Sequence, residues 1–127
     1  MKKKPKNIAF GFVLEQLYAV DPIVKPMFGS HAVYTGNKIV LILRKKELNK
    51  TDNGVWIATI HEHHRTLKAD FPSMRAIGVF GNESGWRNLP EDAPDFEEAV
   101  IKACSLILQG DQRIGKIPNT RPKKKSA

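Results

Sequence analysis

The residues that could do chemistry lie in three short stretches, and the first is the histidine cluster HEHHR at 61–65. His61 and His64 would share one face of a helix, whereas His61 and His63 would share one face of a strand. Two imidazoles make a weak metal site, because a tight zinc site has three or four ligands in a defined geometry. We therefore predict no metal and no cofactor, with His61, His63 and His64 as the ligands if a metal does bind.

The second stretch, GDQRIGKI at 110–117, nearly matches the phosphate-binding motif G-x-x-x-x-G-K-[ST]. Ile117 stands where the motif needs a hydroxyl group that binds magnesium. The motif also needs a strand before it and a helix after it, but a helical pattern precedes it here and Pro118 blocks a helix start. Nucleotide hydrolysis is not expected, and we interpret the segment as a C-terminal stretch that folds back along the domain.

The third stretch places Trp86 beside Arg87 in a segment, 82–92, whose composition predicts an irregular loop. A loop tryptophan next to an arginine can stack on a nucleic-acid base or anchor a protein partner. The alternative, which we favour, is that Trp86 covers the edge of the core. Tyr34 is a further candidate contact residue.

No side chain is predicted to be catalytic. No serine stands in a G-x-S-x-G turn. Cys104 falls within an apolar helical stripe, where we expect a buried and unreactive thiol, because nothing nearby in the sequence would lower its pKa. A single cysteine cannot form an internal disulfide, which is typical of a reducing compartment and predicts a cytoplasmic location.

The formal net charge of +8 comes from the two ends of the chain. Of the 21 basic residues, eight lie at the ends, and the other 13 are matched by the 13 acidic residues between 7 and 120. We predict disordered basic tails over 1–6 and 119–127, which attract phosphate without reading sequence, around one neutral domain over 7–118. The candidate nucleic-acid contacts in these tails are Lys2, Lys3, Lys4, Lys6, Arg121, Lys123, Lys124 and Lys125.

Apolar spacing predicts three helices. Glu15 and Gln16 interrupt the apolar run that follows the first lysines, so this run is read as an amphipathic helix and not as a secretion signal. No stretch approaches the roughly 20 apolar residues of a membrane span, so no membrane partner is expected. The helices are predicted over 8–20, over 61–70 ahead of Pro72, and from Asp92 or Pro94 to Gly110, the last with an apolar stripe from Phe96 to Leu108.

Runs of aromatic and β-branched residues predict four strands. Gly36 and Asn37, which both accept positive φ, form the turn of a hairpin. The order of elements predicts an α+β fold, in which an antiparallel sheet of four to five strands is packed by an N-terminal helix and a long C-terminal helix. The strands are predicted over 27–35, 38–44, 55–60 and 75–81.

The stretch MFGSHAVYTGNKIVLIL at 27–43 resembles the signature of the TfoX N-terminal domain family. The resemblance covers 8–46 by motif and the rest by element order, and His31 departs from it because a second aromatic residue is commoner there. It implies a bacterial cytosolic α+β domain, related to the YjbR-like domains, with a regulatory role and no known catalytic residues. The matching residues are Met27, Phe28, Gly29, Ser30, Tyr34, Gly36 and the apolar strand 39–43.

These observations lead to one hypothesis and one alternative. The hypothesis is a non-enzymatic cytosolic module of the TfoX N-terminal type that binds a macromolecule, either a protein or a nucleic acid, with Trp86 and Arg87 as surface contacts. An exposed sheet edge would allow pairing with a partner or with a second copy of the chain, giving a homodimer. The alternative is a small enzyme or metal-binding protein that uses the cluster from His61 to His64.

Overall fold

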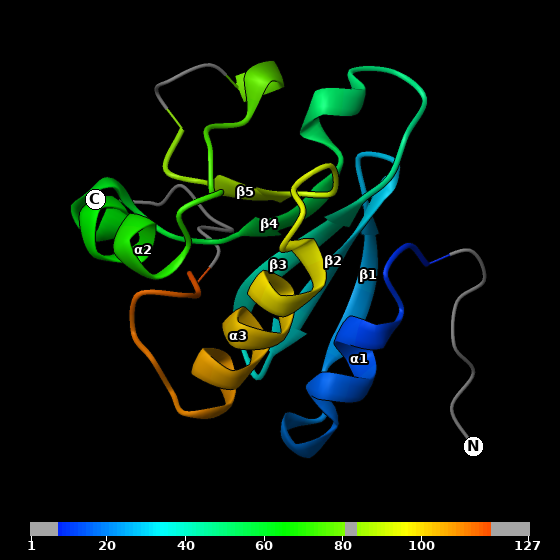
Figure 1. The fold of residues 1–127 in the computed structure, drawn as a ribbon. Helices are drawn as coiled ribbons and strands as arrows, with labels where there is room; N and C mark the ends of the chain where they lie inside the picture. The colour runs from blue at the N-terminus through cyan, green and yellow to red at the C-terminus, as the bar shows by residue number, and fades with distance from the viewer. Residues whose placement is uncertain (1–7, 81–83, 118–127) are drawn as a thin grey trace, which may run out of the picture.

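The computed structural model describes residues 8–80 and 84–117. Its centre is a five-stranded antiparallel sheet in the order β1-β2-β3-β4-β5 (Figure 1), which confirms the predicted α+β class. The predicted basic tails, 1–6 and 119–127, lie outside the described residues. The strands are β1 (Ile23–Met27), β2 (Ser30–Thr35), β3 (Lys38–Arg44), β4 (Gly54–Ile57) and β5 (Arg87–Pro90), and the helices are α1 (Phe12–Gln16), α2 (His64–Asp70) and α3 (Phe96–Leu108).

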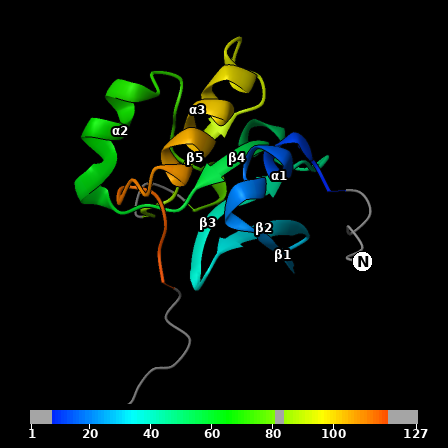
Figure 2. The same cartoon turned by 90° about the horizontal axis from the view of Figure 1, so that it is seen from below.

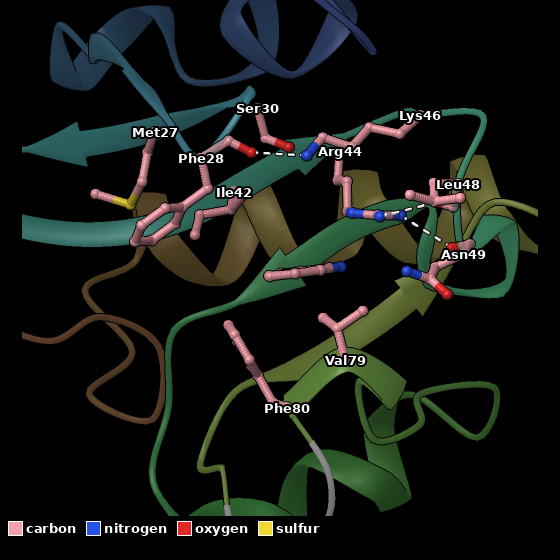
Figure 3. Close-up of a pocket in the computed structure, with 11 residues that line it drawn as sticks. Met27, Phe28, Ser30, Ile42, Arg44, Lys46, Leu48, Asn49, Val79 and Phe80 are labelled. Carbon is pink, nitrogen blue, oxygen red and sulfur yellow. Dashed lines mark hydrogen bonds between the residues drawn. The ribbon is translucent and has the colours of Figure 1, made fainter.

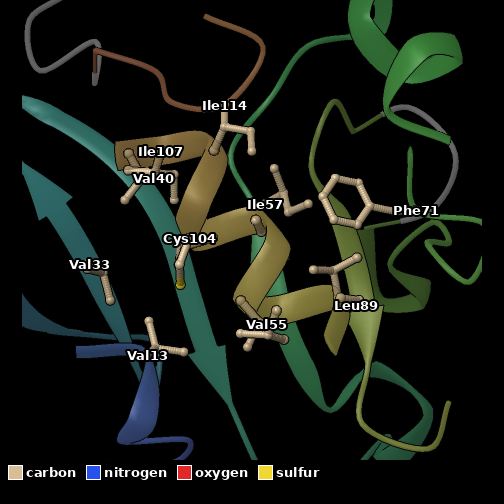
Figure 4. Packing of buried hydrophobic residues seen from close by; sticks show 14 of the residues in the cluster. Val13, Val33, Val40, Val55, Ile57, Phe71, Leu89, Cys104, Ile107 and Ile114 are labelled. Carbon is tan, nitrogen blue, oxygen red and sulfur yellow. The ribbon is translucent and has the colours of Figure 1, made fainter. Parts of the chain in front are cut away.

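Helices α1 and α3 contact each other and lie on the same face of the sheet (Figures 1 and 2). The apolar stripe of α3 packs against buried side chains of the strands (Figure 4). Cys104, at the centre of the stripe, is buried, as predicted. Leu108 was predicted to belong to the stripe but is exposed, and Leu106 packs against the core instead. Each fully buried aliphatic side chain contributes about 1.5–3 kcal/mol, so packing of this stripe holds α3 in place. The buried residues of α3 are Ala99, Val100, Ala103, Cys104 and Ile107.

Different interactions determine where α3 begins and where it ends. The helix ends at Gly110 as predicted, where the N–H groups of Gly110 and Asp111 donate to the carbonyls of Ile107 and Leu106 in the pattern of a Schellman motif. Its start was predicted at Asp92 or Pro94, but Asp95 occupies the N-cap position, and its side chain makes no capping hydrogen bond to the helix. The Asp95 carboxylate accepts a hydrogen bond of 2.9 Å from the Ser73 hydroxyl. Ser73 lies outside the helix, so the sequence of the helix alone does not predict this contact.

The predicted first helix over 8–20 is too long. The α-helix covers only Phe12–Gln16, with a 3₁₀ turn at Tyr18–Val20. Phe10 has a φ of 57°, which no residue of a right-handed helix adopts, and its ring packs edge-to-face on Phe96 with centroids 5.1 Å apart. The α-helix therefore cannot include Phe10 and begins only at Phe12, while the ring of Phe10 packs on α3.

The predicted strand over 27–35 is two strands. Met27 ends β1, and β2 begins at Ser30, so Phe28 and Gly29 are the two central residues of a tight turn. Their φ values of 52° and 78° match a type I′ turn, whose twist fits the strands that it joins. Strand β1 was not predicted, because Pro22 flanks and Pro26 interrupts a short apolar run. Proline is tolerated in this strand because β1 lies at the edge of the sheet.

The predicted strand over 75–81 is wrong. In this segment Arg75 makes one isolated bridge to Asn88, and Gly78–Phe80 form a 3₁₀ turn. The fifth strand instead lies within 82–92, the segment predicted to be an irregular loop, because there the residues pair with β4 in the register Trp56↔Asn88. Pairing with a partner distant in sequence decides this strand, not the β-propensity of its own residues.

The C-terminal stretch folds back along the domain, as predicted. Strand β4 ends at Ile57, earlier than the predicted residue 60, and Lys116 then pairs with Ile39 of β3 in an antiparallel bridge. The N–H of Ile39 donates to the carbonyl of Lys116 at 2.9 Å, and the reverse bond has the same length. The segment at Lys116 thereby continues the sheet beside β3 where β4 stops.

Candidate binding groove on the open face of the sheet

The face of the sheet opposite α1 and α3 is called the open face below. One row of cross-strand neighbours crosses all five strands on this face, and directly paired residues of antiparallel strands point to the same side. The centre of the row is apolar and packs with the buried Ile77 into a second, smaller core. The row is Lys25, Ala32, Ile42, Trp56 and Asn88.

Two adjoining cavities, of about 290 Å³ and 360 Å³, hollow the open face. Both are lined by Met27, Phe28, Ile42 and Phe80, so they form one continuous depression, which we call the groove. Figure 3 shows the residues that line the first of the two cavities. Its floor is therefore the outer surface of the second core. From the shared residues the first cavity extends to Ser30, Arg44, Lys46, Leu48, Asn49, Trp56 and Val79, and the second to Tyr34, Ile39, Trp86, Lys116 and Ile117.

Phe28 stands at the rim of the groove in a conformation that its residue type disfavours. Its ring is 81% exposed, so burial of the ring does not compensate for the positive φ. A bulky residue in the left-handed region costs about 1–2 kcal/mol relative to the ordinary conformation. The Nζ atom of Lys46 donates a hydrogen bond of 2.8 Å to the carbonyl oxygen of Phe28 and ties this turn to the end of β3. The turn thus holds an apolar ring out over the groove.

Arg44 brings a buried positive charge to the first cavity. The residue is 5% exposed, and its guanidinium carbon lies 5.9 Å from the centroid of the Trp56 ring. Its Nη atoms donate to the carbonyls of Leu48 and Asn49 and to the side-chain oxygen of Asn53, at 2.9–3.0 Å. None of the ion pairs found within 8–80 and 84–117 includes Arg44. Its charge is held by neutral dipoles, although buried charges are usually paired.

The charged side chains at the groove are all basic in the described part of the chain. Arg44, Lys46 and Lys116 line it, and no aspartate or glutamate among the described residues does. Two amines also lie over aromatic rings of this face, Lys25 at 5.0 Å from the Tyr34 centroid and Lys116 at 5.7 Å from the Trp86 centroid. An apolar depression with charges of one sign favours ligands that carry the opposite charge.

Asp52 holds in place the segment with Val79 and Phe80, which forms one wall of the groove. Its two carboxylate oxygens accept hydrogen bonds from the backbone N–H groups of Gly78 and Val79, at 2.7 and 3.0 Å. Its backbone carbonyl accepts a hydrogen bond of 2.8 Å from the indole of Trp56. Phe80, which follows in the same 3₁₀ turn, meets the Trp56 ring edge-on with centroids 5.1 Å apart. One buried residue thus positions two of the aromatic side chains.

The structure separates the pair that the sequence analysis grouped. Trp86 packs against the second core and lines the groove, so the interpretation that it covers a core edge holds, and Tyr34 lines the same cavity. Arg87 is paired with Ile57, whose side chain belongs to the core under the helices, and it therefore points to the other face. Its Nη1 atom donates to the carbonyls of Ser84 and Trp86, and burial lowers its pKa.

The histidine cluster lies at the start of α2, and none of its three histidines lines the groove. His61 and His64 come together as a helix predicts, with ring centroids 4.8 Å apart. The Nε2 atom of His64 donates to the carbonyl of Gly85 at 2.7 Å, and burial lowers its pKa despite that bond, with a smaller contribution from the Arg87 charge. Within the described residues, no group of three or more His, Cys, Asp or Glu side chains is arranged to hold a metal ion.

Sequence reasoning missed the groove residues Phe28, Arg44, Phe80 and Lys116. Phe28 falls within the predicted strand over 27–35. The signal for a turn at this point was the Phe-Gly pair between two short apolar runs. Arg44 is the last residue of an apolar strand, and nothing in the local sequence indicates that its side chain is buried. Phe80 and Lys116 reach the open face through contacts with β4 and β3 that no local pattern encodes.

Comparisons of the chain with protein-family models, with curated proteins and with solved structures each found no match. Membership of the TfoX N-terminal family therefore stays a prediction. In the part of the chain that the structure describes, no helix has the length and apolar character needed to cross a membrane.

Proposed function

We propose that this protein is a non-enzymatic binding module that takes a macromolecular ligand with anionic and apolar parts into the groove. The observation that carries the proposal is the groove itself, which has an apolar floor at Met27 and Ile42 and in which every charged residue among the described lining residues is basic. A regulatory role of the TfoX N-terminal type in the cytoplasm is part of the same proposal and rests on the sequence resemblance.

The side chains at the groove support binding in preference to catalysis. Ser30 has the only hydroxyl besides that of Tyr34 among the described residues that line it. Among the lining residues that the structure describes, no histidine or carboxylate accompanies them to act as a general base. The groove runs along β3 from the Arg44 end to the Lys116 end, which suits an extended ligand better than an enclosed small molecule.

A fluorescent dye that is both aromatic and anionic, anilinonaphthalene sulfonate, tests this proposal. Both tryptophans of the chain, Trp56 and Trp86, line the groove, so their emission reports its occupation directly. We expect saturable dye fluorescence with a matching loss of tryptophan emission. Phe28→Ser should weaken dye binding, whereas Tyr18→Ser, which removes an equally exposed ring that does not line the groove, should not.

The opposite result would overturn the proposal. If the folded chain does not bind the dye, or if Phe28→Ser and Tyr18→Ser leave the affinity equally unchanged, the groove is not the binding surface. Circular dichroism of each variant checks that the fold is kept, since the dye also binds partly unfolded chains.

A further inference from the structure

The aromatic rings of the groove are placed as separate platforms. Phe28 comes from the β1–β2 turn, Tyr34 from β2, Phe80 from the 3₁₀ turn behind β4, and Trp86 from the residue before β5. All four line the cavity of about 360 Å³. Rings supplied by different elements across one open surface are the arrangement on which successive nucleic-acid bases stack, because every base has a π-face.

The cations of the groove lie at its two ends. Lys116 is paired with Ile39, and Arg44 lies five positions further along the same strand. At the rise of an extended strand the backbone positions of the two residues are about 16 Å apart along β3. Lys46 lies beside the Arg44 end, and Lys25 lies on the same face over Tyr34. Cations spaced along an aromatic surface suit a ligand with a repeated negative charge.

Arg44 points to phosphate as that charge. A guanidinium held in a fixed orientation presents a planar set of donors that matches a phosphate or a carboxylate group. Three of its hydrogen bonds go to uncharged oxygens of Leu48, Asn49 and Asn53, so none of the described partners neutralises it. An anion in the first cavity would supply the missing counter-charge in a site that the protein has already desolvated.

The same features distinguish between classes of anionic polymer. A duplex keeps its bases paired inside, where the rings of the groove floor cannot reach their faces. An extended peptide can bind by adding a strand to a sheet edge, where its main-chain hydrogen bonds supply the affinity. The groove instead lies across the face of the sheet, over the side chains of Ile42 and Trp56, and offers no row of free backbone groups.

Building on the function proposed above, we infer that the groove binds single-stranded nucleic acid. Bases stack on Phe28, Phe80 and Trp86, while the phosphates lie along Arg44, Lys46 and Lys116. The basic residues at the chain ends add a long-range attraction that does not depend on the groove.

The test uses the full chain with the eight basic tail residues replaced by alanine, so that tail electrostatics do not mask the groove. Binding of a labelled oligothymidine of about 12 nucleotides, a length within the usual site sizes of single-strand-binding folds, is measured by fluorescence anisotropy and tryptophan quenching. An oligouridine of equal length separates DNA from RNA, and the matching duplex separates single from double strands. We expect saturable single-strand binding that quenches tryptophan and exceeds duplex binding.

Two groove variants and two controls locate the binding. Phe28→Asn should weaken the affinity about tenfold through loss of one stacking platform. Lys116→Ala should weaken it by less and should reduce the slope of log affinity against log salt by about 0.7, the value for one phosphate on a single strand. Tyr18→Ser and Arg65→Ala remove an exposed ring and an exposed charge elsewhere and should change neither quantity.

The outcomes separate this inference from the proposed function. If the dye binds in the groove but the oligonucleotides do not, the groove is a binding site and the nucleic-acid inference is wrong. Equal binding of duplex and single strand, or equal affinities for Phe28→Asn and Tyr18→Ser, would also overturn it. If a labelled peptide of alternating Glu and Leu displaces the dye where oligothymidine does not, the occupant is an acidic protein segment.

Discussion

The side-chain amine of Lys46 donates a hydrogen bond of 2.8 Å to the backbone carbonyl of Phe28, across 18 positions of the chain. The bond joins the end of β3 to the turn between β1 and β2. It fixes a turn whose first central residue, a phenylalanine with a φ of 52°, has a disfavoured conformation and an exposed ring. A residue that is both strained and exposed in this way points to a requirement other than stability.

Replacing Phe28 by asparagine should therefore stabilise the protein and weaken ligand binding. Asn-Gly is the preferred pair for a type I′ turn, so Phe28→Asn should raise the free energy of unfolding by about 1 kcal/mol. Urea denaturation measures the gain, and titration with anilinonaphthalene sulfonate measures the loss of affinity. A destabilised variant would show that the ring packs more closely than its exposure indicates.

Removing the negative charge of Asp52 should loosen the groove wall. In Asp52→Asn one of the two acceptor oxygens becomes an NH₂ group, which cannot accept the bond from Gly78 or Val79. We expect the free energy of unfolding to fall by about 1–3 kcal/mol, with faster amide hydrogen exchange over 77–80. Exchange in α3, on the far face, serves as the control, and an equal acceleration there would mean that the effect is global.

Gly54 should tolerate no side chain, because strand β5 lies too close. A Cβ atom at this position would lie 2.2 Å from the carbonyl oxygen of Leu89, and the φ of 148° is itself unfavourable for other residues. Gly54→Ala should lower the free energy of unfolding by about 3 kcal/mol. Gly11→Ala is the matched control, since an added Cβ there meets nothing within 4 Å, and a gain of about 0.4–1 kcal/mol is expected.

Acidification should destabilise the protein in part through His64. Burial lowers its pKa below the ordinary value of 6.5 for histidine, so the unfolded chain takes up a proton more readily than the folded one. The free energy of unfolding therefore falls as the pH drops below 6.5, and this fall ends once the pH is below the lowered pKa in the folded state.

The variant His64→Gln tests this dependence. It keeps a donor for the carbonyl of Gly85 but cannot titrate. Denaturation at about pH 8 gives the structural cost of the substitution, because the imidazole is neutral there in both states. Between that pH and about pH 5.5 the variant should lose less stability than the wild type. An equal loss in both proteins would assign the acid sensitivity to other groups.

Cys104 should react only when the chain opens. Burial raises the pKa of its thiol to about 12, so neither thiolate nor access is available in the folded protein. Ellman's reagent should label the native chain slowly, at a rate that rises with low urea concentrations, and should label the denatured chain at once. Rapid labelling of the native protein would contradict the packing of α3 on the sheet.

The elements with a strong local pattern were predicted from the sequence. The apolar stripe of α3, the end of that helix at Gly110 and the hairpin of β2 and β3 follow from periodicity and from turn residues. Elements without such a pattern were not. Strand β5 exists because its residues pair with β4, and β1 because it pairs with β2 beyond a turn that the sequence analysis read as strand.

The candidate site shows the same division. Trp86 and Tyr34 could be named as contact candidates from the sequence, since an aromatic residue near a turn or strand end is recognisable by type. That both face one groove while Arg87 faces away follows from the folded sheet. Strand register decides the face on which each side chain lies, and a register is a relation between distant segments. The burial of Arg44 beside Trp56 depends on the same relation, because the two residues lie on β3 and β4 and only the pairing of these strands brings their side chains together.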